Sequence, residues 1–368
     1  MAKLRVGVIF GGRSGEHEVS LRSARSVIRE LDPTKYEVVP IAISKSGQWF
    51  SGSGVLEACE QGDLEGLDPV TFLPEPGNNM LYRRKEDGVL EALINIDMVF
   101  PVLHGTFGED GTLQGMFEMA EMPYVGAGVL ASSVAMDKVL FKDVMKSWNI
   151  PIVDYVLLTG QEITDDFDAM LEKAEGVAPY PLFTKPVNQG SSVGVSKCKN
   201  RSDLIEGLLE AAQYDRRVMV EKGLDAREIE VSVLGNENPE ASIPGEIVPG
   251  DEFYSYRAKY IDDTSDLLIP AALDQDLSEE IRRIAVEAFK AIDGAGMARV
   301  DFLLDKVDGK PYVNELNTIP GFTSISMYPK LWEATGLSYP ELLDRLIELA
   351  LVRQNQKMQL VRSYEVGR

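Results

Sequence analysis

Three short apolar segments near the start of the chain constrain its fold most strongly. They span Arg5–Phe10, Val38–Ile43 and Met98–Leu103, and glycine or polar residues follow each of them. Runs of this length that are apolar at nearly every position are typical of parallel strands buried on both faces. The spacing of Ser20–Leu31 fits a helix between the first two strands. This part of the chain therefore predicts an open α/β sheet.

The segment Ser44–Asn95 interrupts this pattern. It is rich in glycine, proline and acidic residues, and its apolar residues show only weak periodicity. Because glycine and proline break regular structure, we expect a peripheral insertion with loops, attached to the first domain.

A second region opens at Gly126. Apolar spacing predicts helical structure over Val129–Trp148 and a helix over Asp203–Tyr214. The same region contains three strand-like segments, namely Tyr155–Leu158, Leu182–Lys185 and Val193–Lys197.

A third region begins near Val218. Its segments Arg227–Leu234 and Ala298–Leu304 alternate apolar with polar residues, as half-solvated antiparallel strands do. Amphipathic helices are predicted over Leu277–Ile292 and Tyr339–Val352. We therefore expect three domains, over residues 1–125, 126–220 and 221–368.

The composition limits the partners of the chain. Its 368 residues contain Lys+Arg 37 and Asp+Glu 59, which gives a formal net charge of −22. Because a bound polyanion needs a basic surface, we expect no nucleic acid and no acidic membrane as partner. No stretch approaches the ~18 apolar residues of a membrane-spanning helix. A small anion such as a nucleotide is not excluded by this charge, because it needs only a few local cations. Cys59 and Cys198 lie far apart and lack the spacing of a zinc site, which fits a reducing cytoplasm.

Two short motifs point to other enzyme classes. Gly126–Ala131 matches the dinucleotide fingerprint, yet no acidic residue ends a following strand at the required distance. A dehydrogenase is therefore a distant alternative to a plain turn into a helix. Gly190–Gly194 matches the GxSxG turn of serine hydrolases, which needs a later histidine. Both histidines, His17 and His104, precede it, and this excludes a hydrolase of the usual order.

The segment Pro181–Gly194 has another use. It contains a strand with Lys185, a loop rich in glycine and serine, and a second strand. Backbone N–H groups and serine hydroxyls of such a loop can bind phosphate oxygens, while the lysine supplies positive charge. A plain hairpin with a solvent-facing lysine is the alternative.

A second cluster of polar residues lies near the end of the chain. Strand alternation places Arg299 with Asp301 on one face, and Glu315 with Asn317 on one face of the returning segment. An Asp-Gly turn signal separates the two segments. If they pair, their oxygen atoms can converge on Mg²⁺, which takes further ligands from water and phosphates. A surface patch of salt bridges is the alternative.

Short segments from one end of the chain to the other form a series. They are GGRSGEHEVS (11–20), HGTFGEDGTLQG (104–115), YVGAGVLASSVAMDK (124–138), FTKPVNQGSSVGVSK (183–197), VEKGLDAREIE (220–230), FYSYRAKY (253–260), ARVDF (298–302) and NELNTIPGFTSISMYP (314–329). In this order they resemble the D-alanine–D-alanine ligases of the ATP-grasp superfamily. The resemblance implies an N-terminal α/β substrate domain, followed by two α+β lobes that clamp ATP between antiparallel sheets.

The resemblance also implies the residues that bind ATP and metal. The ATP contacts would be Lys138 and Lys185 at the phosphates, Ser191 and Ser192 in the covering loop, Glu221, Lys222 and Leu224 at the adenine, Glu228 at the ribose and Phe253 against the base. Asp301, Glu315 and Asn317 would bind two Mg²⁺ ions, for which Mn²⁺ is a compatible substitute.

On the amino-acid side, Glu16 resembles the carboxylate that orients the first D-alanine through its ammonium. The hydroxyls of Ser191 and Tyr260 would assist Glu16, and His104 would lie near this subsite. The remaining implied roles are oxyanion donation by Arg299 and the Gly321 N–H, binding of the second carboxylate by Ser326 and the Met327 N–H, and contact of Lys259 with the transferring phosphoryl group. Lys259 and Tyr260 would belong to a closing loop over residues 253–263.

The implied activity is ATP-dependent ligation of two D-alanines through an acyl phosphate, for peptidoglycan precursor synthesis. Tyr260 is of the type associated with dipeptide products, and Met327 stands where D-serine relatives carry arginine. The alternatives are another ATP-grasp ligase, of the D-Ala–D-Ser or D-Ala–D-lactate type, and a non-catalytic nucleotide-binding regulator. The expected partners are D-alanine, ATP and, as is common in the family, a second copy in a homodimer.

Overall fold

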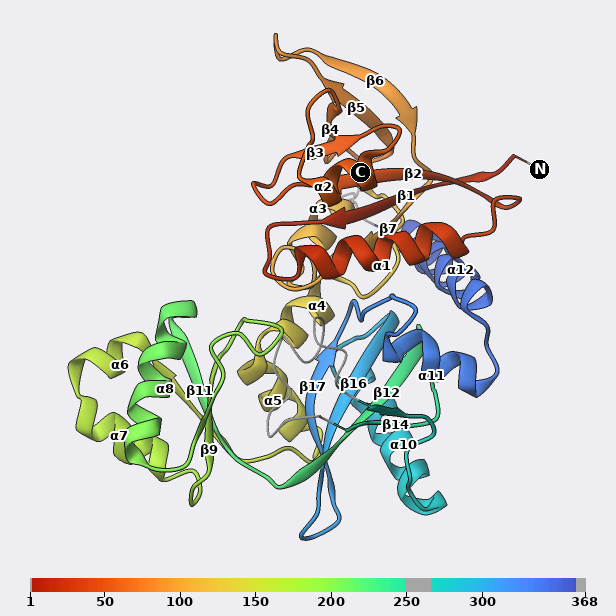
Figure 1. The fold of residues 1–368 in the computed structure, drawn as a ribbon. Coiled ribbons are helices and arrows are strands. Elements are labelled where there is room, and N and C mark those ends of the chain that lie inside the picture. Colours follow the sequence, from red (N-terminus) through yellow and green to blue (C-terminus); the bar gives the residue numbers. More distant parts are fainter. Residues whose placement is uncertain (1, 249–265, 362–368) are drawn as a thin grey trace, which may run out of the picture.

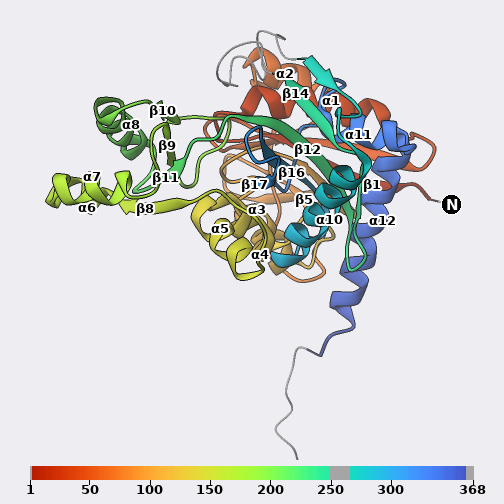
Figure 2. The same cartoon turned by 90° about the horizontal axis from the view of Figure 1, so that it is seen from below.

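Three sheets organise the part of the chain that the computed structural model describes, residues 2–248 and 266–361. Figure 1 shows the first sheet at the top, the third below it, and the second in a separate lobe. Figure 2, seen from below, shows this lobe projecting away from the rest. Within these residues no helix has the length and apolar character needed to cross a membrane.

The N-terminal sheet has the predicted parallel centre. Strand β1 (Leu4–Gly11) pairs in parallel with β2 (Tyr36–Ile43) and β7 (Met98–Val102). Helix α1 (His17–Glu30) connects the first two strands, and α3 (Thr112–Ala120) follows β7 along the chain. The expected strands and helix are therefore confirmed.

The loops predicted for residues 44–95 are wrong, because this segment extends the same sheet. Its elements are β3 (Trp49–Ser51), α2 (Val55–Gln61), β4 (Asp68–Thr71), β5 (Met80–Arg84) and β6 (Leu90–Asn95), and the strands pair antiparallel in this order. The strands are short, and β6 is exposed or half-buried along its whole length. Since few of their side chains are buried, the apolar alternation that identifies a strand is missing.

The second sheet is antiparallel in the order β10-β9-β11-β8. Its elements are β8 (Tyr155–Thr159), α6 (Gly160–Asp165), α7 (Phe167–Glu175), β9 (Leu182–Pro186), β10 (Ser196–Cys198), α8 (Arg201–Tyr214) and β11 (Arg217–Lys222). The strand predicted from Val193 begins only at Ser196. Residues before it stay in turns, with Val193 N–H donating to Gly190 O and Val195 N–H to Ser192 O.

The predicted helical stretch over Val129–Trp148 divides at Asp137 into α4 (Val129–Met136) and α5 (Lys138–Ser147). The Asp137 carboxylate accepts a hydrogen bond from the Leu140 N–H at 2.9 Å, which caps the first turn of α5. The second Asp137 oxygen pairs with Arg217 at the start of β11. Lys138 is thereby fixed as the first residue of α5.

The third sheet has the order β15-β14-β12-β16-β17, with β13 beside β12. Its elements are β12 (Ala226–Gly235), β13 (Glu240–Ala241), β14 (Gly245–Val248), β15 (Asp266–Leu268), α10 (Gln275–Ala291), β16 (Gly296–Asp305), β17 (Pro311–Asn317), α11 (Met327–Thr335) and α12 (Tyr339–Met358).

The half-solvated strand predicted at Arg227–Leu234 is wrong for most of its length. Strand β12 is buried from Ile229 to its end. Ile229 and Val231 join the core that α10 covers, while on the other face the Ser232 hydroxyl donates to Tyr328 O of α11 at 3.2 Å. Helices on both faces therefore remove the solvated side. Strand β16 does alternate between buried and half-buried residues.

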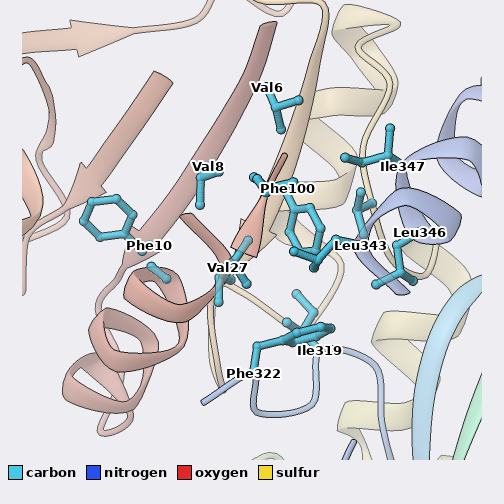
Figure 3. Close-up of a cluster of buried hydrophobic side chains, with 14 of the residues drawn as sticks. Val6, Val8, Phe10, Val27, Phe100, Ile319, Phe322, Leu343, Leu346 and Ile347 are labelled. Atoms are coloured by element: carbon cyan, nitrogen blue, oxygen red, sulfur yellow. The ribbon is translucent and has the colours of Figure 1, made fainter. Parts of the chain in front are cut away.

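One hydrophobic core joins the two ends of the chain. Figure 3 shows apolar side chains of β1, α1 and β7 packed against α12 and the loop after β17, including Val6, Val27, Phe100, Phe322 and Leu343. The rings of Phe100 and Phe322 meet edge to face, with centroids 6.0 Å apart. This core brings residues 318–322 to the carboxyl ends of β1 and β7. The domain boundaries at 125/126 and 220/221 stay predictions.

Candidate active site

Glu16 lies where the loop after β1 meets the glycine- and serine-rich loop after β9. The Ser191 hydroxyl donates a hydrogen bond to the Glu16 carboxylate, across 175 positions of sequence. A Cβ added to Gly105 or Gly190 would lie 2.6 or 2.8 Å from Glu16 Oε2. Both glycines therefore allow backbone to approach this carboxylate closely.

The glycine- and serine-rich loop has an unusual backbone. Ser191 and Ser192 have φ angles of 50° and 59°, in the left-handed region that disfavours residues with a Cβ. Lys138 Nζ donates to Gln189 O at 2.7 Å, and the Asn188 N–H donates to the Asp215 carboxylate at 2.8 Å. The loop is thus anchored at its base while its serine tip reaches Glu16. Strands β9 and β10 do pair antiparallel around this loop, but the solvent-facing lysine of the alternative is wrong, because the Lys185 side chain is only 14% exposed.

Lys185 on β9 pairs with Glu221 on the neighbouring strand β11. The other oxygen of Glu221 lies 3.2 Å from Lys142 Nζ of α5. Burial alone would raise the pKa of Glu221, but the charges of Lys185 and Lys142 outweigh it and lower that pKa to about 2. Burial lowers the pKa of Lys142, and the Glu221 carboxylate opposes this shift.

The end of β11 and the turn that leads into β12 carry the predicted adenine contacts. The Lys222 N–H donates to Asp154 O and the Gly223 N–H to Pro181 O, each at 2.9 Å. Leu224 and Glu228 are half-buried, and the Lys222 side chain is exposed. The Glu221 carboxylate binds the two lysines, so the adenine contact implied for it stays a prediction.

Strands β16 and β17 pair as predicted, with Arg299 opposite Asn317 and Asp301 opposite Glu315. Arg299 donates from Nε and Nη2 to the two oxygens of Asp301 at 2.7 and 2.6 Å. Asn317 Nδ2 donates to Asp301 Oδ2 at 3.0 Å, and Arg299 Nε also lies 3.0 Å from Glu230 Oε2. The face therefore combines one guanidinium with three carboxylates and an amide.

The donor set of this face fits a hard cation. Among the described residues there is no cluster of three or more His, Cys, Asp or Glu side chains arranged to bind a metal. The predicted set instead has two carboxylates and one amide oxygen on adjacent strands, and such oxygens suit Mg²⁺ when phosphates and water complete the shell. Asp301 already pairs with Arg299, and Glu315 lies 3.9 Å from Lys138 Nζ, so both carboxylates attract cations here.

His104 is buried beneath the predicted first subsite. Its Nδ1 lies 2.9 Å from Ile319 O, and its Nε2 lies 3.2 Å from the Ser23 hydroxyl. Because a carbonyl oxygen only accepts, Nδ1 carries a proton in this arrangement. Burial lowers the pKa of His104. Both ring nitrogens therefore connect protein segments, and the substrate contact predicted for His104 is not offered by a ring nitrogen.

Glu109 forms a second buried connection that the sequence analysis missed. Its two carboxylate oxygens accept from the Gly105 N–H at 2.8 Å and the Ile319 N–H at 2.9 Å. Burial, followed by the charge of Glu16, raises the pKa of Glu109 to about 8. Glu109 and His104 together attach the loop after β7 to the loop after β17.

The loop before α11 contains the residues predicted for the second amino acid. The Ser326 hydroxyl accepts from the Thr323 N–H at 3.0 Å, and a Cβ on Gly321 would lie 2.8 Å from Ser326 Oγ. Met327 is the first residue of α11, and its side chain is buried beside Ile247. Its backbone N–H is therefore the group that fits the predicted role. Phe253, Lys259 and Tyr260 lie outside the described residues.

Two further charged residues of the site were not predicted. Lys142 pairs with Glu221, and Glu230 pairs with Arg299. Lys142 follows Lys138 by one helical turn, a spacing that places both on one face of α5. Glu230 shares a face of β12 with Glu228 and lies opposite Asp301. These spacings were the available signals, yet each is also common on solvated surfaces.

Comparison with known proteins identifies relatives along the whole chain. A family model described as the D-ala D-ala ligase N-terminus matches residues 5–127, and one described as the D-ala D-ala ligase C-terminus matches residues 144–348. A D-alanine–D-alanine ligase of Thermoanaerobacter sp. is 52% identical over 363 residues, covering 97% of this chain and 99% of that protein.

Solved structures show the same fold. The D-alanine-D-alanine ligase from Coxiella burnetii superposes with a TM-score of 0.84 at 38% identity, covering 100% of this chain and 99% of the other. The VanG D-Ala:D-Ser ligase from Enterococcus faecalis gives a TM-score of 0.84 at 34% identity, covering 95% of this chain and 100% of the other. The predicted fold class is thereby confirmed.

Proposed function

The chain belongs to the D-alanine–D-alanine ligase family, and from this we propose how its site joins two D-alanines to D-alanyl-D-alanine with ATP. The family and the ATP-dependent ligase activity predicted from the sequence are confirmed by these relatives. The product serves peptidoglycan precursor synthesis. ATP and a divalent metal ion are requirements of this activity.

One observation carries the assignment of residues. Glu16, from the N-terminal sheet, and Ser191, from the loop after Lys185, are in direct contact. A carboxylate that binds an amino acid's ammonium group thus lies beside a loop suited to phosphate oxygens. This contact supports a site in which an amino acid would bind next to a nucleotide, as activation of its carboxylate requires.

For ATP, we assign Lys138 and Lys185 to the phosphates, because the Lys138 ammonium binds Gln189 O in the glycine- and serine-rich loop and Lys185 lies on β9, the strand that leads into this loop. Ser191 and Ser192 would cover the phosphates from above. Adenine and ribose would lie against the remaining residues assigned to ATP, namely Glu221, Lys222, Leu224, Glu228 and Phe253.

We assign Asp301, Glu315 and Asn317 as the metal ligands. They would bind two Mg²⁺ ions, for which Mn²⁺ is a compatible substitute. Their oxygens lie on the paired strands β16 and β17. A metal ion held by these residues would neutralise negative charge on the phosphates. Lys138 and Lys185 would add to this neutralisation.

For the amino acids, we assign Glu16 to the ammonium of the first D-alanine, with Ser191 and Tyr260 supporting it. Ser326 and the Met327 N–H would bind the carboxylate of the second. His104 would contribute by fixing the loop after β7. Because methionine is uncharged and the Met327 side chain is buried beside Ile247, this position offers no charged group to the second substrate, which favours D-alanine over D-serine.

The reaction then has two steps. An oxygen of the first carboxylate attacks the γ-phosphorus of ATP, which forms the acyl phosphate and releases ADP. The second amine attacks the acyl carbon and phosphate leaves. Arg299 and the Gly321 N–H donate to the developing oxyanion, and each such donor is typically worth ~2.7–4 kcal/mol. Lys259 would neutralise the transferring phosphoryl group.

We further propose a cytoplasmic location and a homodimer, with no nucleic acid as partner. A net charge of −22 supports the absence of nucleic acid.

Release of ADP with ATP, Mg²⁺ and single amino acids tests the activity. D-alanine should support turnover, and L-alanine should give only background. Mixtures of D-alanine with D-serine or D-lactate, analysed by mass spectrometry, should yield mainly D-alanyl-D-alanine. A dominant mixed product would refute D-alanine as the preferred second substrate, and no D-alanine-dependent ADP release would refute the activity.

A further inference from the structure

Lys142 is a buried lysine for which the proposed reaction has no use. It lies on α5 one turn after Lys138, and its side chain is only 1% exposed. Burying an ammonium group is unfavourable unless a carboxylate compensates it. The ammonium group of Lys142 therefore needs a nearby carboxylate to compensate the cost of its burial.

Its compensating group is Glu221. Lys142 Nζ lies 3.2 Å from Glu221 Oε2, while Glu221 Oε1 pairs with Lys185. The Glu221 side chain is 2% exposed and that of Lys185 14% exposed, so water screens this group weakly. The Lys142 ammonium also lies 5.8 Å from the centre of the Tyr155 ring.

The charges of the three residues decide what Lys185 can do. With Glu221 alone, the positive charge of Lys185 would be cancelled, and its ammonium would gain little from a phosphate. When Lys142 is protonated, as its contact with Glu221 favours, two positive charges face one negative charge, and the three residues together keep one positive charge. Lys185 is the most exposed of the three, so it is the one that can reach a ligand.

We propose that Lys142 is a positioning residue for the nucleotide: by binding Glu221, it leaves the charge of Lys185 available to the phosphates. This inference rests on the ATP site proposed above. It goes beyond that assignment because Lys142 itself does not touch the ligand. A purely structural lysine would instead support the fold and affect all ligands alike.

The test compares the dissociation constants of ADP and adenosine by calorimetry in the presence of Mg²⁺. Because the two ligands differ only by the diphosphate, the ratio of their dissociation constants reports how much the phosphates contribute to binding. In Lys142→Met we expect ADP binding to weaken about tenfold while adenosine binding stays within about twofold, as for a weakened charge-assisted contact. Lys146→Met, one turn further along α5 and exposed, is the matched control and should change neither.

Two further variants separate positioning from support of the fold. In a Lys185→Met background, Lys142→Met should change ADP affinity less than about twofold, because it acts through Lys185. Lys142→Met/Glu221→Gln removes the two fully buried charges together, and the charge of Lys185, which is 14% exposed, is then no longer cancelled by Glu221. That double variant should regain the adenosine-to-ADP ratio of the unaltered protein, and it should fold even if Lys142→Met does not.

Three results would overturn the proposal. They are equal losses of ADP and adenosine in Lys142→Met, a full additional loss in the Lys185→Met background, and an unrestored ratio in the double variant. Absence of ADP binding by the unaltered protein would refute the nucleotide site itself together with this role. Normal wild-type binding with an unchanged Lys142→Met ratio would refute only the role of Lys142.

Discussion

The hydroxyl of Ser191 donates a hydrogen bond to the carboxylate of Glu16, although the two residues lie in loops that follow strands of different sheets. Neither loop alone forms a site. Glu16 ends the loop after β1, and Ser191 belongs to a loop anchored by Lys138. The site therefore depends on this contact and on the charges around it.

Glu16→Gln should weaken binding of the first D-alanine and leave ADP affinity unchanged. A hydrogen bond to a charged group is worth about 2 kcal/mol, which corresponds to a KM increase of roughly 30-fold for the first substrate. Steady-state kinetics over a range of D-alanine concentrations measure it. Glu18→Gln is the control, since Glu18 is exposed and pairs with Lys45. Equal effects of the two changes would contradict the role of Glu16.

Gly190→Ala should reduce kcat/KM, because its Cβ would lie 2.8 Å from Glu16 Oε2 and would displace that carboxylate. We expect a loss of at least about tenfold. Gly115→Ala is the matched control: Gly115 lies inside α3 with no atom within 4 Å of an added Cβ. It should keep full activity and stabilise the protein by about 0.5–1 kcal/mol. An active Gly190→Ala enzyme would show that backbone need not approach Glu16 closely.

Glu315→Gln should raise the Mg²⁺ concentration needed for half-maximal activity and lower the maximal rate at least about 100-fold. The change keeps the size of the side chain and removes the charge that attracts a cation between β16 and β17. A Mg²⁺ titration of ADP release measures both effects. Glu287→Gln, at an exposed pair with Arg283 on α10, should leave the titration unchanged. Coincident curves for the wild type and Glu315→Gln would refute the metal assignment.

Glu221 should make stability depend on pH in acid. Its pKa is lowered to about 2 from the ordinary 4.5, so the stabilisation is present above pH 4.5 and is lost as the pH falls toward 2. Glu221→Gln lacks this ionisation. The Tm of the wild type should therefore exceed that of Glu221→Gln at pH 7, and the difference should shrink between pH 4.5 and 3. A constant difference over this range would mean that the pKa of Glu221 is not lowered in the folded protein.

The centre of the first sheet and the β16–β17 pair were predictable because their patterns are local. Arg299, Asp301, Glu315 and Asn317 follow strand alternation around a short turn, and the structure pairs them accordingly. The strands of residues 44–95 were not predictable, since little of their surface is buried. Burial on both faces of β12 depends on α10 and α11, which come later in the chain.

The charge network of the site was only partly predictable. Lys138 and Lys185 were found through family motifs, whereas Lys142 and Glu109 have partners that only the folded chain brings close. His104 was expected at a substrate subsite, and instead both its ring nitrogens contact protein groups. Long-range pairing of this kind leaves no periodic signal in a single sequence.

Transfer of an oxygen atom from D-alanine to phosphate tests the central claim most directly. The protein would be incubated with ATP, Mg²⁺ and D-alanine labelled with ¹⁸O in its carboxylate, and the released phosphate analysed by mass spectrometry. If the carboxylate attacks the γ-phosphorus, each phosphate released with a dipeptide should carry one ¹⁸O atom. Dipeptide formation with unlabelled phosphate, or with AMP as the nucleotide product, would contradict the account.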